Sequence, residues 1–155
     1  MKTEETWRLI PSLPEYLASD QGRVMRLPFV GKMPHGGPKY YGGDPHKGQW
    51  AELDQRYLIV FRGKPYKVAS LICEAFHGPR PLGNVVMHLN EDSRDNRAEN
   101  LSWGTQKENL NAPGFRAWLT SGGRYKDVTR YGLRLSRARA KKLVAQHTDQ
   151  SETRP

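Results

Sequence analysis

Apolar and polar residues divide the chain into three zones of different character. Residues 1 to about 50 are rich in proline and glycine and contain one clear run of strand-forming residues, over 22–27. The turn-rich residues 30–48 predict a long loop or a loosely ordered hairpin. Apolar residues are concentrated between 51 and 112, whereas arginine and lysine dominate 113–155. We therefore expect a folded centre with an N-terminal module and a basic C-terminal tail.

The central zone predicts short strands that alternate with helices. Strand formers occur in brief runs, and one segment places its apolar residues on a single helical face before Gly78 and Pro79 end it. A later helix is predicted to begin after Thr105, an N-cap residue with Glu108 as its capping-box partner. In chain order, the predicted elements are strands at 57–61 and 66–68, a helix at 69–76, strands at 84–88 and 101–103, and a helix at 106–110.

The charge of the chain favours a polyanionic partner. The sequence holds 25 Lys and Arg against 16 Asp and Glu, a formal net charge of +9. Residues 113–155 contain ten of these bases and three acids, so seven of the nine net charges lie in the tail, where a helix is predicted over 135–146. Such a segment can be a solvated helix, but its charge favours contact with phosphates of double-stranded DNA. The candidate DNA-binding residues are Arg116, Arg124, Lys126, Arg130, Arg134, Arg137, Arg139, Lys141 and Lys142.

Cysteine content and hydropathy restrict the class of protein further. Cys73 is the single cysteine, so neither an intrachain disulfide nor a cysteine-based zinc cluster can form, and a reducing cytoplasm fits. It lies in an apolar run and is expected to be a buried thiol. No stretch approaches the roughly 20 apolar residues of a membrane span, and residues 1–11 lack the apolar core of a signal peptide. We expect a cytoplasmic protein.

One histidine and two asparagines at fixed offsets are the strongest candidates for chemistry. Asn100 lies twelve residues beyond His88, and Asn109 lies twenty-one beyond it. A neutral histidine at the end of a strand can take a proton from water beside a phosphate. A divalent cation can neutralise charge on that phosphate, and oxygen ligands suit such a cation. Asn100 would order the polar loop through its amide. The pattern indicates a small metal-dependent nuclease site.

Three segments resemble the HNH homing-type endonucleases of phages. They read VVMHLNEDSRDNRAENLSWGTQKEN, KVASLICEAF and TWRLIPSLPEYLASDQGRVMRL, and together they cover about residues 5–110. The resemblance implies an α+β fold with a small ββα-metal (HNH, His-Me finger) core, a β-rich N-terminal module and a basic helical tail. It also implies that His88 is the general base, that Asn100 orders the loop and that Asn109 is a ligand of Mg²⁺ or Mn²⁺. A phage-encoded protein of this kind would act in the host cytoplasm.

The chain departs from the family pattern next to the proposed base. The residue before the histidine is usually an aspartate that binds the metal, and here it is Met87, whose thioether is a poor ligand for Mg²⁺ or Mn²⁺. Ala69 replaces a histidine of the upstream segment, and Asn90 replaces an acid. A substitute metal ligand would come from Asn90, Asp92 or Glu108.

We therefore expect a metal-dependent DNA endonuclease that hydrolyses phosphodiester bonds. Its expected parts are an N-terminal accessory module (1–50), an HNH nuclease core (51–112) and a DNA-contacting tail (113–155). One site per chain and no clear dimerisation helix favour a monomer that nicks one strand. Two alternatives stay open at this point: an HNH-fold DNA-binding protein without cleavage activity, and a regulator that uses the tail against an acidic protein.

Overall fold

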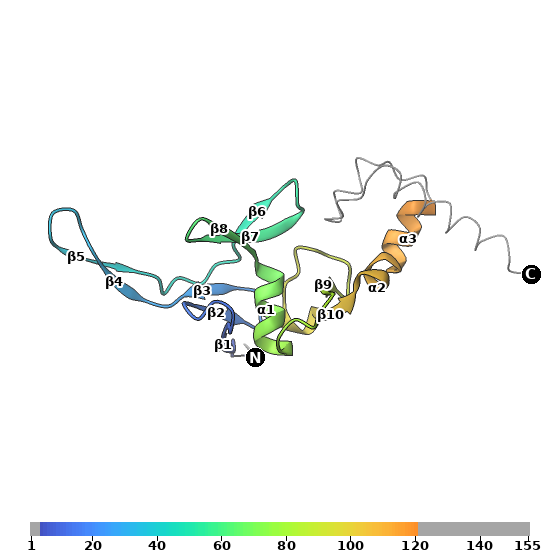
Figure 1. The fold of residues 1–155 in the computed structure, drawn as a ribbon, viewed down its shortest axis with the longest axis horizontal. Coiled ribbons are helices and arrows are strands. Elements are labelled where there is room, and N and C mark those ends of the chain that lie inside the picture. Colours follow the sequence, from blue (N-terminus) through green and yellow to red (C-terminus); the bar gives the residue numbers. More distant parts are fainter. Residues whose placement is uncertain (1–3, 121–155) are drawn as a thin grey trace, which may run out of the picture.

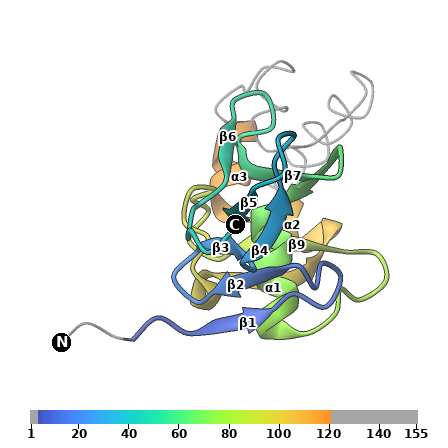
Figure 2. The same cartoon turned by 90° about the vertical axis from the view of Figure 1, so that its left-hand side faces the viewer.

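The first three strands form a small antiparallel sheet. A computed structural model describes residues 4–120, in which β1 (Trp7–Leu9), β2 (Tyr16–Ser19) and β3 (Val24–Arg26) pair in the order β1-β2-β3. The strand expected over 22–27 corresponds to β3, whereas β1 and β2 were not predicted as strands. Figure 2 shows β1 and β2 crossing in front of the helix that forms the centre of the fold.

The turn-rich segment that follows is a hairpin. Its strands β4 (Phe29–Lys32) and β5 (Pro38–Tyr41) pair antiparallel, with Phe29 opposite Tyr41. The two rings stack at a centroid distance of 5.0 Å, and most of the hairpin is exposed. Figure 1 shows it extending from one end of the molecule. Of the two predicted alternatives, loop or hairpin, the structure has the hairpin.

A second antiparallel sheet leads into the central helix. It contains β6 (Gln49–Ala51), β7 (Arg56–Phe61) and β8 (Lys64–Lys67), and α1 (Val68–His77) follows directly. The predicted run over 57–61 and the helix over 69–76 correspond to β7 and α1. The helix ends at Gly78, whose φ of 85° suits glycine.

The remaining elements form the ββα unit expected from the sequence. Strands β9 (Asn84–His88) and β10 (Leu101–Thr105) pair antiparallel, and a 3₁₀ turn, η1 (Ala98–Asn100), precedes β10. Helix α2 (Gln106–Leu110) begins with the predicted capping box between Thr105 and Glu108. A further helix, α3 (Pro113–Thr120), starts where the sequence had suggested only a tail. Proline suits the first turn of a helix, so Pro113 explains why α3 begins there.

One buried cluster joins these parts. Ile10, Ala18 and Val24 of the N-terminal sheet share it with Ile72 of α1 and Leu101 of β10. Helix α1 contacts strands of the first sheet, the second sheet and the ββα unit (Figure 1). The α+β class is therefore confirmed. The division at residue 50 stays a prediction, and a continuous core crosses it.

Two further expectations concern burial and membranes. Cys73 is fully buried, as predicted, and burial raises the pKa of its thiol to about 12, so the thiol is protonated and inert. Among residues 4–120, no helix has the length and apolar character needed to cross a bilayer. The helix predicted over 135–146 lies outside the described residues.

Candidate active site

A cavity of about 300 Å³ brings the predicted chemistry together. Met87 and His88 of β9, Asp92 of the following loop and Asn109 of α2 all line it. Met87, His88 and Asp92 are close in sequence, whereas Asn109 lies twenty-one residues beyond His88, and the β9–β10 pairing followed by α2 brings it to the same cavity. Among residues 4–120, three residues other than glycine have a positive φ, and two of them, Gln55 at 50° and Glu91 at 62°, also line this cavity. Strained backbone of this kind is concentrated at functional sites.

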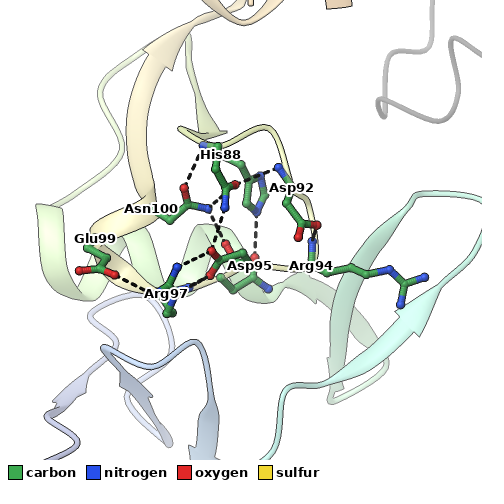
Figure 3. Close-up of polar contacts among 9 residues, drawn as sticks. His88, Asp92, Arg94, Asp95, Arg97, Glu99 and Asn100 are labelled. Atoms are coloured by element: carbon green, nitrogen blue, oxygen red, sulfur yellow. Dashed lines mark hydrogen bonds and ion pairs between the residues drawn. The ribbon is translucent and has the colours of Figure 1, made fainter. Parts of the chain in front are cut away.

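The side-chain amide of Asn100 orders the loop between β9 and β10. Its Oδ1 accepts the backbone N–H of Asn90 at 2.9 Å, and its Nδ2 donates to Asn90 Oδ1 and to the Asp95 carbonyl, both at 2.8 Å. Figure 3 shows these bonds converging inside the loop. Asn100 is only 7% exposed, so water does not compete well for its hydrogen bonds. Its geometry fits the loop-ordering role predicted for it.

Carboxylates hold the outer part of the same loop. Asp95 accepts Asn90 Nδ2 at 2.9 Å and forms a two-point contact with the guanidinium of Arg97 at 2.9 and 2.8 Å (Figure 3). The Arg97 side chain is the main cause that lowers the pKa of Asp95 to about 2. Asn90 Oδ1 already accepts the Asp92 N–H and Asn100 Nδ2. The amide of Asn90 thus serves the loop, which weakens its case as a metal ligand.

His88 is held in one orientation by a residue that the sequence analysis missed. Its Nε2 lies 2.9 Å from Oδ1 of Asn96, which is 4% exposed. Because an amide oxygen only accepts, Nε2 carries the hydrogen and Nδ1 keeps a lone pair in the neutral ring. The sequence could have indicated this residue, because Asn96 lies eight residues beyond His88, within the motif that resembles the HNH endonucleases.

The surroundings of His88 favour the neutral ring. Burial is the main cause that lowers the pKa of His88, and the positive charge of Arg56 acts in the same direction. The hydrogen bond to Asn96 and the charges of Asp92 and Asp95 oppose this effect without reversing it. A neutral imidazole near pH 7 is the form that a general base requires.

Met87 occupies the wall where the family pattern has an aspartate. A Cβ placed on Gly104 would lie 2.0 Å from the Met87 sulfur, so the thioether packs directly over that glycine. Met87 therefore fills space at the cavity with a soft, uncharged group. Glu108, one proposed substitute, accepts hydrogen bonds from the N–H and hydroxyl of Thr105, and these bonds lower its pKa. Oxygen Oε2 of its carboxylate therefore serves the helix cap.

The other oxygen groups that line the cavity are candidate ligands for a cation. Asp92 lines it and uses one carboxylate oxygen to accept the Arg94 N–H, and Asn109 faces it from α2. Glu91 also lines it, but both its oxygens accept the Gly114 N–H. Within residues 4–120, no three His, Cys, Asp or Glu side chains gather as a metal cluster. Magnesium often has one or two protein oxygen ligands plus water and substrate phosphate. Asp92 and Asn109 fit that arrangement.

The predicted DNA-binding residues fall almost entirely beyond the described part of the chain. Arg116 lies exposed on α3, whose Phe115 lines the cavity. The others, which are Arg124, Lys126, Arg130, Arg134, Arg137, Arg139, Lys141 and Lys142, lie outside the described residues. Arg56, which was not a candidate, lines the cavity beside His88. Arg56 is distant from His88 in the sequence, so no local sequence pattern indicated it.

Comparison with known proteins identifies the segment that carries this cavity. The family model of the HNH endonucleases matches residues 66–111, from the end of β8 to the residue after α2. Residues 66–111 belong to the HNH endonuclease family. The resemblance inferred from the sequence is thus confirmed over the segment that contains His88, Asn100 and Asn109.

Comparisons over the whole chain are more distant. A solved structure with a related arrangement is described as "DNA binding and cleavage by the HNH homing endonuclease I-HmuI". It is 19% identical, with a TM-score of 0.46, over 90% of this chain and 66% of that one, slightly under two thirds. No curated protein matches the chain significantly.

The loop network leads to a stability prediction. Replacing Asn100 with alanine leaves the Asn90 N–H and the Asp95 carbonyl without their partner, so we expect the free energy of unfolding to fall by roughly 1–3 kcal/mol. Urea denaturation measures the change. Glu99→Ala is the matched control, because that neighbouring side chain is 74% exposed and should cost little. Equal losses for both variants would contradict a special role for Asn100.

Proposed function

We propose that this HNH protein hydrolyses phosphodiester bonds of double-stranded DNA. The observation that carries the proposal is His88, oriented by Asn96 and kept neutral by burial, in one cavity with Asp92 and Asn109. HNH family membership of residues 66–111 supports the same reaction class. The net charge of +9 supports a DNA partner. One site of the His88 type per chain favours nicking by a monomer.

The proposed reaction uses His88 as the general base. With Nε2–H donated to Asn96, Nδ1 is the basic nitrogen that takes a proton from the attacking water. The water oxygen bonds to phosphorus, the bond to the 3′ oxygen breaks, and that oxygen takes a proton from solvent, so the products carry 5′-phosphate and 3′-hydroxyl ends. Asp92 and Asn109 would hold Mg²⁺ or Mn²⁺, which would neutralise charge at the phosphate. Asn100 acts indirectly by keeping the loop that carries Asp92 in place.

A second candidate function is DNA binding without cleavage. Met87 favours this function, because it lines the cavity at the position where the family pattern has a metal-binding aspartate, and a thioether is a poor ligand for Mg²⁺. Such a protein would bind duplex DNA with a steep dependence on salt and would leave the strands intact.

The first experiment compares wild type and His88→Ala on supercoiled plasmid. Loss of the base should lower the nicking rate by about 10²–10⁴-fold, and EDTA should stop the wild-type reaction. His35→Ala is the matched control, since His35 is exposed in the turn of the β4–β5 hairpin. If His88→Ala nicks at the wild-type rate, the assignment is wrong. DNA binding without wild-type nicking would favour the second function.

The pH dependence of nicking should follow the lowered pKa of His88. The reaction needs the neutral ring, so the rate should be level near neutral pH and fall only below the ordinary histidine pKa of about 6.5. The unfolded chain binds this proton at higher pH than the folded one, so the free energy of unfolding should also decrease as pH falls below about 6.5. Single-turnover rates and urea denaturation, each measured over a range of pH, test the two effects. An inflection above 6.5 would contradict the prediction.

The substitution at position 87 can be tested by restoring the acid. Met87→Asp adds a charged oxygen ligand to the cavity wall and should tighten Mn²⁺ binding by roughly tenfold or more. Isothermal calorimetry on the free protein measures this without reference to activity. Met33→Asp, at an exposed methionine of the hairpin, is the control for added charge. If Met87→Asp gains no affinity beyond this control, position 87 does not face the ion.

A further inference from the structure

A second cavity adjoins the one that contains His88. It has a volume of about 410 Å³, and Lys67, Ser70, Arg80 and Gln106 are among the residues that line it. Arg56, Val86 and Asn109 line both cavities. The two cavities are therefore adjacent and form one groove, and Arg56 lies between them.

The charges of the second cavity suit a phosphate. Three bases line it, Arg56, Lys67 and Arg80, against the single acid Glu74. The Glu74 carboxylate accepts the N–H and the hydroxyl of Ser12 at 2.9 and 2.6 Å, so these donors satisfy part of its hydrogen-bonding capacity. Arg80 is fixed by an Nε–H bond to the Asn84 carbonyl, which aligns it with the start of β9. Such a set suits the backbone of a nucleic acid strand.

The β6–β7 hairpin places Arg56 at this border. Arg56 is the first residue of β7 and pairs with Ala51, and the turn before it contains Gln55, whose side chain donates to the Glu52 carbonyl at 2.8 Å. The guanidinium of Arg94, in the loop after β9, lies 4.0 Å from the ring centre of Trp50 on β6. This cation–π contact ties the hairpin to the catalytic loop. The hairpin that carries Arg56 is thus held against the loop after β9.

We propose that Arg56 contacts the scissile phosphate and that the second cavity holds the adjacent phosphate of the same strand. The guanidinium presents paired N–H donors that match two phosphate oxygens, and burial makes its charge more effective there. Arg56 stabilises the charge that develops on the phosphate in the transition state, whereas Lys67 and Arg80 hold the strand. The inference rests on the proposed DNA cleavage and adds a catalytic residue and a binding subsite to it.

The decisive experiment separates rate from binding. Arg56→Gln should lower kcat for plasmid nicking by about 10²-fold, with a smaller change in KM. Arg56→Lys should lower kcat by about tenfold, because lysine keeps the positive charge but cannot donate two parallel N–H bonds as a guanidinium does. Lys67→Gln and Arg80→Gln should raise KM, and also Kd for a duplex measured by anisotropy in EDTA, more than they lower kcat. Arg62→Gln is the control, since Arg62 is exposed on the β7–β8 turn and lines neither cavity.

The outcomes distinguish this inference from the proposed function. If wild type does not nick, the proposed function fails and this inference fails with it. If wild type nicks but Arg56→Gln and Arg56→Lys retain its kcat, only the assignment of Arg56 is wrong. If Lys67→Gln and Arg80→Gln bind duplex as tightly as Arg62→Gln, the second cavity is not a phosphate subsite. Thermal unfolding checks that each variant is folded. If Arg56→Gln does not fold, the kcat of Arg56→Lys alone tests the assignment of Arg56.

Discussion

The side-chain amide of Asn100 is the interaction on which the site depends. It joins the two ends of the long loop between β9 and β10, and Asn90 extends the same network to Asp92 and Asp95. Most of this segment is polar, so its path depends more on hydrogen bonds than on apolar contacts. With these bonds, the loop presents Asp92 to the same cavity as His88 and Asn109. A few buried hydrogen bonds therefore determine the geometry that chemistry requires.

The elements of the nuclease segment could be predicted because their signals are local. The Thr105–Glu108 capping box fixes the start of α2, and Gly78 fixes the end of α1. Both signals depend only on neighbouring residues, as does the run of strand formers that ends at His88. The order of strand, polar loop, strand and helix was enough to bring His88 and Asn109 to one cavity.

Other features could not be predicted because they arise from contacts distant in sequence. β1 and β2 are three and four residues long, and their pairing rather than their composition makes them strands. Arg56 reaches the cavity only because the β6–β7 hairpin folds beside the loop after β9. The packing of Met87 over Gly104 likewise depends on the register of two strands. The sequence identified the missing carboxylate, and the structure indicates what occupies its place.

The turn between β2 and β3 has a consequence for how the protein folds. The carbonyl of Asp20 accepts the N–H of Ala98 at 2.9 Å, and a Cβ on Gly22 would lie 3.0 Å from the backbone of Asn96. This contact closes most of the described chain into one large ring, and such contacts form slowly because the chain entropy of closure comes first. We therefore expect the loop around Asn96 to complete its packing against this turn late, after the N-terminal strands have paired. A nascent chain would acquire its ordered histidine only near the end of folding.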